Sequence, residues 1–229
     1  VLFRSHVHYP QTEMIGAFGE QLLEWLTTYT FPVESQFADE AYADEIARFF
    51  IEQLLSHGTT TAMVFCTLHP ASVNALFSEA LRLNMRLIAG KVMMDRHAPE
   101  YLSETAEESY RQTRELILRW QHQGRLGYAL TPRFAPTSTP ELLDAVRRLR
   151  EEFPQTWLQT HLSENPNEVA WVNDLWPEHA RYLDVYHHYG LTGEGSVFAH
   201  GIHLHDEEWQ CLHDTGSAVA FCPTSNLFL

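Results

Sequence analysis

From about residue 59 onward, short runs of β-branched or apolar residues alternate with longer amphipathic segments. This alternation predicts strands at residues 59–66, 85–92, 126–132, 157–162, 196–200 and 218–222. It predicts helices at residues 41–57, 71–83, 103–123, 140–153, 166–175, 179–189 and 206–215. Because consecutive parallel strands need a crossover connection, usually a helix, the pattern indicates an α/β fold with a parallel sheet.

So many strand–helix units in one chain favour a (β/α)8 barrel. With a further strand that ends at residues 6–8, about seven strands are present, so we expect an incomplete TIM-like barrel. A doubly wound open sheet is the alternative, and it would place a glycine-rich phosphate turn after the first strand. The sequence there is His-Val-His-Tyr-Pro-Gln, without a GxGxxG motif, and the barrel is therefore preferred.

The two ends of the sequence point to a fragment. Residues 1–5, Val-Leu-Phe-Arg-Ser, match the in-frame translation of a common sequencing-adaptor end, and we expect them to be an adaptor-derived artefact. The other end stops within a motif at Leu229. We therefore expect residues 6–229 to be a partial barrel domain, truncated at both ends, with the eighth strand beyond Leu229. On its own, the 229-residue chain is expected to be unstable or inactive.

The charge balance limits the classes of partner. The chain carries 15 basic and 30 acidic residues, a formal net charge of −15, which repels phosphate backbones and anionic lipids. We therefore expect neither nucleic acid nor a membrane as a partner. The three cysteines are few, odd in number and far apart, which favours a reducing, cytoplasmic compartment.

Four of the 14 histidines fall where three predicted strands end. His6 and His8 are two residues apart in an extended segment, so both imidazoles face one side. His161 and His200 lie at the ends of two later strands. A single histidine at a strand end is more often structural than a ligand. Four at matching positions predict a metal site, because the carboxyl ends of barrel strands form one active site.

Glu164 follows His161 by three residues, in His-Leu-Ser-Glu-Asn. A carboxylate at this distance can reach a water molecule at the metal without binding the metal, which suits proton transfer. The alternative makes Glu164 a first-turn acid of the next helix, stabilised by the helix dipole. Both interpretations can hold together.

These residues resemble the HxH, HxxE and later strand-end histidine pattern of the amidohydrolase superfamily, a family of metal-dependent hydrolases. Within it, the chain resembles the guanine deaminase family over essentially all of residues 6–229. The motifs that carry this closer resemblance are His-Val-His-Tyr-Pro-Gln (6–11), Phe-Gly-Glu-Gln-Leu-Leu-Glu-Trp (18–25), Gly-Thr-Thr-Thr (58–61), Lys-Val-Met-Met-Asp-Arg (91–96), Thr-Pro-Arg-Phe (131–134), Thr-His-Leu-Ser-Glu-Asn (160–165) and Phe-Cys-Pro-Thr-Ser-Asn-Leu (221–227).

The resemblance implies a function and a set of roles. It implies zinc-dependent hydrolysis of guanine to xanthine and ammonia, in guanine catabolism, by an enzyme that is usually a homodimer. It makes Glu164 the general acid and base. The zinc ligands that it implies are His6, His8, His161 and His200. The residues that it implies for guanine binding are Gln11, Arg133 and Phe134.

Several of these residues have simpler interpretations. Without the resemblance, Arg133 is as well explained as a surface residue, Phe134 as a core aromatic and Gln11 as a polar loop residue.

A family aspartate that binds the metal after strand eight lies outside the sequence. Another amidohydrolase, acting on cytosine, an adenine derivative or a triazine, is the alternative enzyme. A non-catalytic scaffold is disfavoured because every visible ligand position is filled.

Overall fold

The computed structural model describes residues 2–17 and 21–227 and divides the chain into two compact units. Unit 1 comprises residues 1–92, 99–102 and 111–129, and unit 2 comprises residues 93–98, 103–110 and 130–229. Val1, residues 18–20 and residues 228–229 lie outside the described residues. The expected artefact at residues 1–5 and the motif at residues 18–25 therefore fall partly outside them.

The strands form one parallel sheet with the order β1-β2-β3-β5-β6-β7-β8, and β4 pairs with β5. Their bounds are β1 (Leu2–His8), β2 (Thr59–Phe65), β3 (Arg86–Gly90), β4 (Val92–Met93), β5 (Leu126–Pro132), β6 (Trp157–Leu162), β7 (Ser196–His200) and β8 (Ala218–Ala220). Seven strands thus follow one another in chain order, as in a (β/α) barrel that lacks a strand. The predicted α/β fold class, an incomplete barrel of about seven strands, is confirmed.

The helices follow the strands closely. Those of eight or more residues are α3 (Glu40–Ser56), α4 (Pro70–Arg82), α5 (Ala106–Trp120), α6 (Pro140–Glu152), α7 (Pro166–Leu175) and α9 (Asp206–Thr215). Shorter ones are α1 (Leu22–Trp25), η2 (Leu26–Thr30), α2 (Phe31–Ser35), α8 (Tyr182–His188), α10 (Pro223–Asn226) and the 3-10 turns η1 (Tyr9–Met14), η3 (Gln36–Ala38), η4 (Glu100–Leu102) and η5 (Ala135–Thr137). Among the described residues, no helix is both long and apolar enough to cross a membrane.

The helix predicted at residues 179–189 is shorter, at Tyr182–His188, and the strand predicted at residues 218–222 ends at Ala220. Two further differences have local reasons. The strand expected at residues 85–92 is interrupted at Lys91, whose N–H donates to the Tyr128 hydroxyl at 3.2 Å instead of continuing the ladder. The helix expected from residue 103 begins at Ala106, because the Thr105 hydroxyl accepts the N–H of Glu108 at 3.2 Å and so caps the helix.

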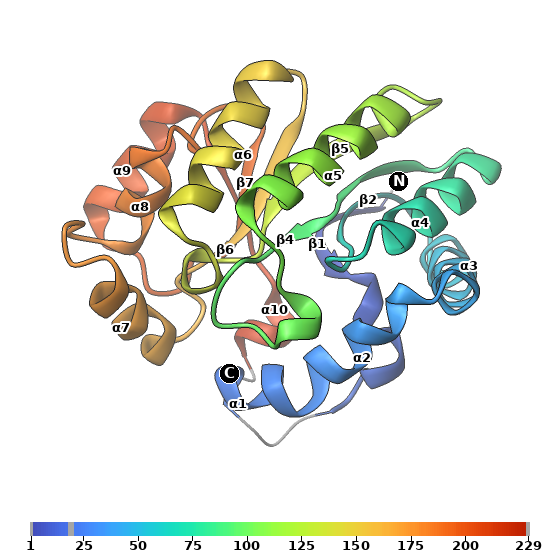
Figure 1. Ribbon diagram of the computed structural model, residues 1–229, viewed down its shortest axis with the longest axis horizontal. Coiled ribbons are helices and arrows are strands. Elements are labelled where there is room, and N and C mark those ends of the chain that lie inside the picture. Colours follow the sequence, from blue (N-terminus) through green and yellow to red (C-terminus); the bar gives the residue numbers. More distant parts are fainter. Residues whose placement is uncertain (1, 18–20, 228–229) are drawn as a thin grey trace. The chain divides into compact units, whose positions relative to one another are not determined.

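In unit 1, β1, β2, β3 and the first part of β5 pair in parallel, and α3 and α4 lie side by side (Figure 1). Asp39 accepts the N–H of Tyr42 at 3.0 Å and caps α3. Gly58 follows α3 with a φ of 81°, a left-handed conformation that suits glycine at a helix end. The register of β1 on β2 is irregular between Arg4 and Val7. Residues 2–4 pair with β2, and the adaptor origin of residues 1–5 stays a prediction.

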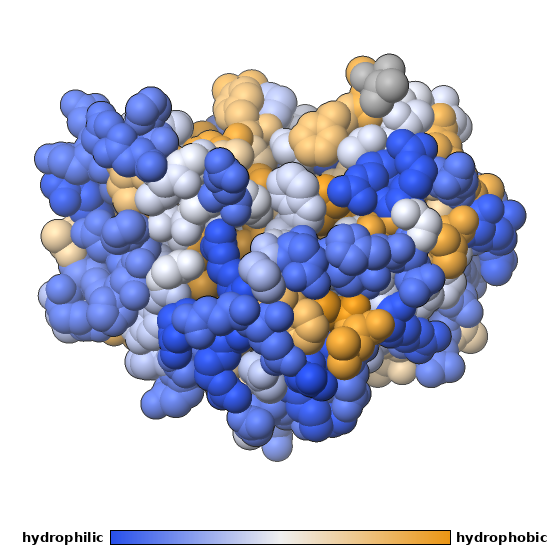
Figure 2. Space-filling model, turned by 90° about the horizontal axis from the view of Figure 1, so that it is seen from above, coloured by the Kyte–Doolittle hydropathy of each residue, from blue (hydrophilic) through white to orange (hydrophobic). Residues whose placement is uncertain are grey.

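In unit 2, β6, β7 and β8 pair in parallel, in a register that places His161 beside Ala199 and Leu162 beside His200. Figure 2 shows one face of the molecule, on which the described residues are mainly hydrophilic, with smaller hydrophobic areas. Residues 126–132 of β5 are all buried, as expected of a strand covered on both faces. The interior therefore lies along the strands, and the polar residues of interest lie at their ends.

The packing of α4 gives a stability prediction. Leu76 in this helix is 0% exposed, whereas Leu81, one turn later, is 42% exposed. Leu76→Ala removes buried contacts and leaves a cavity, so we expect it to lower the free energy of unfolding by about 2–5 kcal/mol. Leu81→Ala is the matched control and should cost under about 1 kcal/mol. Chemical denaturation measures both, and equal losses would contradict this packing.

Candidate active site

The predicted site residues divide between the two units. Unit 2 contains Arg133, Phe134, His161, Glu164 and His200. Unit 1 contains His6, His8 and Gln11. The assignment of all eight as one site stays a prediction.

His161 lies near the end of β6 and is 9% exposed. Its Nδ1 is 2.7 Å from the carbonyl oxygen of Arg133, the residue that follows β5. A carbonyl can only accept a hydrogen bond, so Nδ1 carries the proton and donates it. The lone pair of His161 is therefore on Nε2. A neutral imidazole held in this way is typical of histidines that bind a metal.

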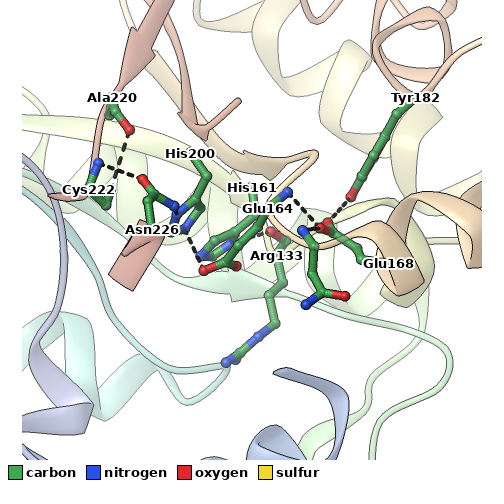
Figure 3. Close-up of polar contacts among 10 residues, drawn as sticks. Arg133, His161, Glu164, Glu168, Tyr182, His200, Ala220, Cys222 and Asn226 are labelled. Carbon is green, nitrogen blue, oxygen red and sulfur yellow. Dashed lines mark hydrogen bonds and ion pairs between the residues drawn. The ribbon is translucent and has the colours of Figure 1, made fainter. Parts of the chain in front are cut away.

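His200 ends β7, and its side chain lies between two polar groups (Figure 3). The Asn226 amide donates to His200 Nδ1 at 2.9 Å, and the Asn226 carbonyl oxygen accepts the N–H of Cys222 at 3.0 Å. On the other side, His200 Nε2 lies 3.3 Å from Glu164 Oε1. Burial lowers the pKa of His200 to about 4, so the ring is neutral at pH 7.

The rings of His161 and His200 are stacked, with centroids 5.5 Å apart and an interplanar angle of 16°. Each ring offers a ligand nitrogen, and the two nitrogens lie within 4.8 Å of each other. Two buried imidazoles at this spacing fit the donor set that zinc prefers. In the structure, however, His200 Nε2 faces the Glu164 carboxylate, so His161 fits the role of ligand more directly than His200.

Glu164 is the buried acid of the site, with only 8% of its side chain exposed. Burial raises its pKa, the nearby Glu168 carboxylate raises it further, and Arg133 opposes both, for a value of about 8. At neutral pH this carboxyl group can therefore hold a proton, which a general acid requires.

The turn that carries Glu164 has an unusual backbone. Ser163 adopts a φ of 49°, and His200, at the end of the next strand, adopts a φ of 75°. Left-handed conformations at non-glycine residues are uncommon and cluster at functional sites. The helix α7 begins only at Pro166 with Asn165 as its N-cap, so Glu164 precedes the helix. The alternative that Glu164 is a first-turn acid is wrong, and Glu168 has that position.

Arg133 is 2% exposed, so the alternative of a surface residue is wrong. Its carbonyl holds His161, while its side chain extends away from the Glu164–His200 pair (Figure 3). Phe134 is 4% exposed and packs edge-on against Trp171 of α7, with ring centroids 6.3 Å apart. The structure thus places both residues directly after β5, which is the strand next to β6.

In unit 1, His6 and His8 lie on one side of β1, with ring centroids 5.0 Å apart. His8 stacks on Phe65 of β2 at 4.5 Å, and His6 meets the same ring edge-on at 5.0 Å. The expectation that both imidazoles face one side is therefore met. Gln11 lies two residues into the 3-10 turn η1 and is half-buried.

The sequence reasoning missed three residues that support this site: Glu168, Tyr182 and Asn226. Asn165 and Glu168 form a capping box, a pattern that the spacing Asn-x-x-Glu could have revealed. Asn226 belongs to the motif at residues 221–227 but had no assigned role. Tyr182 donates to Glu168 at 2.8 Å across 14 residues, and no local pattern predicts such a contact.

Comparison with known proteins shows that the chain belongs to the amidohydrolase family. The amidohydrolase family matches residues 2–229. Guanine deaminase of Escherichia coli K12 is 62% identical over 225 residues, which are 98% of this chain and 51% of that protein. The chain thus spans about half the length of the curated relatives that it matches.

Solved structures give the same relationship. The E. coli guanine deaminase structure matches with a TM-score of 0.98 and 61% identity, over 99% of this chain and 52% of that one. Guanine deaminase from C. acetobutylicum, solved with guanine bound in the active site, matches with a TM-score of 0.95 and 35% identity. That match covers 99% of this chain and 54% of the other.

The buried carboxyl group of Glu168 predicts a dependence of stability on pH. Burial raises its pKa in the folded state from 4.5 to about 7, although its hydrogen bonds lower it. Between these values the folded state binds more protons than the unfolded state, so stability is full below pH 4.5 and is lost as the pH rises through about 7. Between about pH 5 and pH 8, the free energy of unfolding of the wild type should therefore fall by about 2–3 kcal/mol. Glu168→Gln has no carboxyl group to titrate at this position and should not show this fall.

Equilibrium unfolding of the wild type and the variant at the two pH values measures the effect. Asp174→Asn, which removes an exposed carboxylate from the same helix, is the control. A wild-type protein that is equally stable at both pH values, or a Glu168→Gln variant with the wild-type slope, would contradict the expected proton uptake.

Proposed function

Since the chain belongs to the amidohydrolase family, we propose that the protein that carries it hydrolyses guanine to xanthine and ammonia with a bound zinc ion. The observation that supports this most strongly is the arrangement in unit 2, where a buried carboxyl group lies 3.3 Å from one of two stacked, buried histidines. The guanine deaminases that the chain resembles support the choice of substrate.

The proposed zinc ligands are His6, His8, His161 and His200. The donor set supports them, because His161 directs its proton to the Arg133 carbonyl and His200 is neutral. When bound, zinc lowers the pKa of a water molecule to near neutrality.

Glu164 carries the proton transfers in this proposal. In its carboxylate form it would take a proton from the attacking water, and its raised pKa favours keeping that proton in the buried site. It would then deliver that proton to the purine ring nitrogen next to the carbon under attack. The proton that remains on the added hydroxyl group would then pass through the Glu164 carboxylate to the amino group, so that the C–N bond breaks, ammonia leaves and the carbonyl of xanthine forms. Contact with His200 Nε2 at 3.3 Å holds the carboxyl group on the side of the histidines.

Gln11, Arg133 and Phe134 are the proposed guanine-binding residues. A guanidinium presents a planar fork of donors that suits a purine carbonyl, and a glutamine amide both donates and accepts. Phe134 offers an aromatic surface for the base. Burial supports this assignment for Arg133 and Phe134. Both lie beside the strand end that carries His161, and neither faces solvent.

The proposal also covers the compartment and the oligomeric state of the enzyme. Guanine breakdown in the cytoplasm, by a homodimer, is the role that the family resemblance implies. The sparse cysteines and the net charge of −15 support a reducing compartment and a small-molecule substrate instead of nucleic acid or a membrane.

A substrate panel tests the proposed function. The whole protein that contains these residues, loaded with zinc, should release ammonia from guanine with a kcat/KM at least about 100-fold above that for cytosine, adenine or a chlorotriazine, because a site built to bond a substrate group rejects analogues that lack it. Ammonia release and conversion of guanine to xanthine are measured together. Negligible turnover of guanine by the zinc-loaded protein would overturn the assignment.

Two substitutions separate the proposed roles of chemistry and metal binding. Glu164→Gln should lower kcat by about 10²–10⁴-fold, because an amide cannot shuttle the proton, and should keep the zinc content of the wild type. His161→Ala should lose both zinc and activity, because it removes a ligand. Elemental analysis beside steady-state kinetics gives both readouts. Loss of zinc in Glu164→Gln, or full zinc in His161→Ala, would contradict these roles.

A further inference from the structure

Glu168, in the first turn of α7, is 0% exposed and uses its carboxylate to hold the turn before the helix. Its Oε2 accepts the N–H of Glu164 at 2.8 Å and the N–H of Asn165 at 3.2 Å. Figure 3 shows it beside Glu164, on the side away from His200. Glu168 therefore contacts the backbone of the proposed general acid, while His200 contacts its side chain.

A capping role alone does not account for this arrangement. In a capping box, the side chain of the third helical residue has to accept only the N–H of the N-cap residue, which here is Asn165. The shorter of the two bonds goes instead to Glu164, one residue before the cap.

Glu208 of α9 provides the internal comparison. It is also the glutamate of a capping box, and it is 2% exposed. Its Oε2 accepts the N–H of the N-cap His205 at 2.9 Å, and its Oε1 accepts the N–H of Leu183 at 3.0 Å. Neither bond reaches a proposed catalytic residue. The two buried glutamates thus differ in the contact that Glu168 makes with Glu164.

Helix α8 fixes Glu168 from the other side. The hydroxyl of Tyr182, which is 1% exposed, donates to Glu168 Oε1 at 2.8 Å. Tyr186, one turn later, donates its hydroxyl to the carbonyl of His161 at 3.0 Å. The rings of the two tyrosines stack at 5.7 Å. One face of α8 therefore contacts both His161 and the residue that holds Glu164.

The turn itself needs such support. Ser163 holds a left-handed φ of 49°, which an L-residue adopts only where its surroundings impose it. Its carbonyl accepts the N–H of Ile202 at 3.0 Å, from the turn after β7. Without the bond from Glu168, the Glu164 N–H would lose its acceptor and the turn could relax.

We propose that Glu168 is a positioning residue that holds the backbone of Glu164, and that Tyr182 of α8 fixes the Glu168 carboxylate in the required orientation. The inference rests on the proposed function, in which Glu164 transfers protons. A displacement of about 1 Å at such a group costs on the order of 10²-fold in rate.

Kinetics of the whole, zinc-loaded protein give the first test. Glu168→Met keeps the side-chain length but removes both acceptor oxygens, and it should lower kcat roughly 10- to 100-fold with KM for guanine within about three-fold. Glu168→Gln retains an acceptor for the Glu164 N–H and should restore kcat to within about three-fold of the wild type. Glu208→Met, the matched control, should keep kcat within about two-fold.

A double-mutant cycle separates positioning from general destabilisation. If Glu168 acts through Glu164, Glu168→Met should cost less than about two-fold in kcat when Glu164 is already glutamine. Should Glu168→Met not fold, Tyr182→Phe replaces it in the cycle and should lower kcat about 3- to 10-fold. Equal losses in both backgrounds, or an equal loss in Glu208→Met, would overturn the proposal.

Hydrogen exchange provides a readout that does not depend on activity. The amide of Glu164 should exchange at least about ten-fold faster in Glu168→Met than in the wild type, while amides in the middle of α7 stay protected. Unchanged exchange at Glu164 would overturn the positioning role. Failure of the wild type to deaminate guanine, with faster exchange in the variant, would overturn the proposed function and leave the structural bond established.

Discussion

The hydrogen bond from His161 Nδ1 to the Arg133 carbonyl is the contact on which the rest of the site depends. It joins the ends of β5 and β6, and it sets the tautomer of the ring, because a carbonyl oxygen accepts and never donates. The same oxygen also accepts the backbone N–H of His161 at 3.2 Å and the hydroxyl of Thr160 at 3.2 Å. His161 is thereby fixed in place and in orientation before any ligand arrives, which lowers the cost of binding one.

Burial determines the protonation of the other two groups. His200 is neutral because its charged form would be poorly solvated, and Glu164 retains a proton at higher pH for the same reason. One physical cause therefore lowers the pKa of a base and raises the pKa of an acid that lie 3.3 Å apart. Perturbed pKa values of this kind, in contact and at strand ends, are more typical of catalytic sites than of structural ion pairs.

The sequence predicted what is periodic or local. The bounds of β5, β6 and β7 are as expected, because short β-branched or apolar runs alternate there with longer amphipathic segments. The positions of His161 and His200 at strand ends followed from these bounds. The break at Lys91 and the start of α5 after Thr105 each depend on a single hydrogen bond. In the first case the Lys91 N–H donates to a tyrosine hydroxyl 37 residues away, and periodicity does not carry such information. The contacts of Glu168 with Tyr182 and of His200 with Asn226 were missed for the same reason, since they join separate elements.

The residues proposed for metal binding and proton transfer and the residues that hold them come from different layers of the fold. His161, Glu164 and His200 lie on the strands or directly after them, while Glu168 and Tyr182 lie on the helices that follow. The turns after β6 and β7 are joined directly, because Gly201 donates to the Leu162 carbonyl at 2.8 Å and Ile202 donates to that of Ser163. Any movement of α7 or α8 relative to the strands would therefore be transmitted to both turns at once. In the proposed function, α7 and α8 therefore affect the geometry of proton transfer as well as stability, because they bond to the backbone of Glu164 and His161.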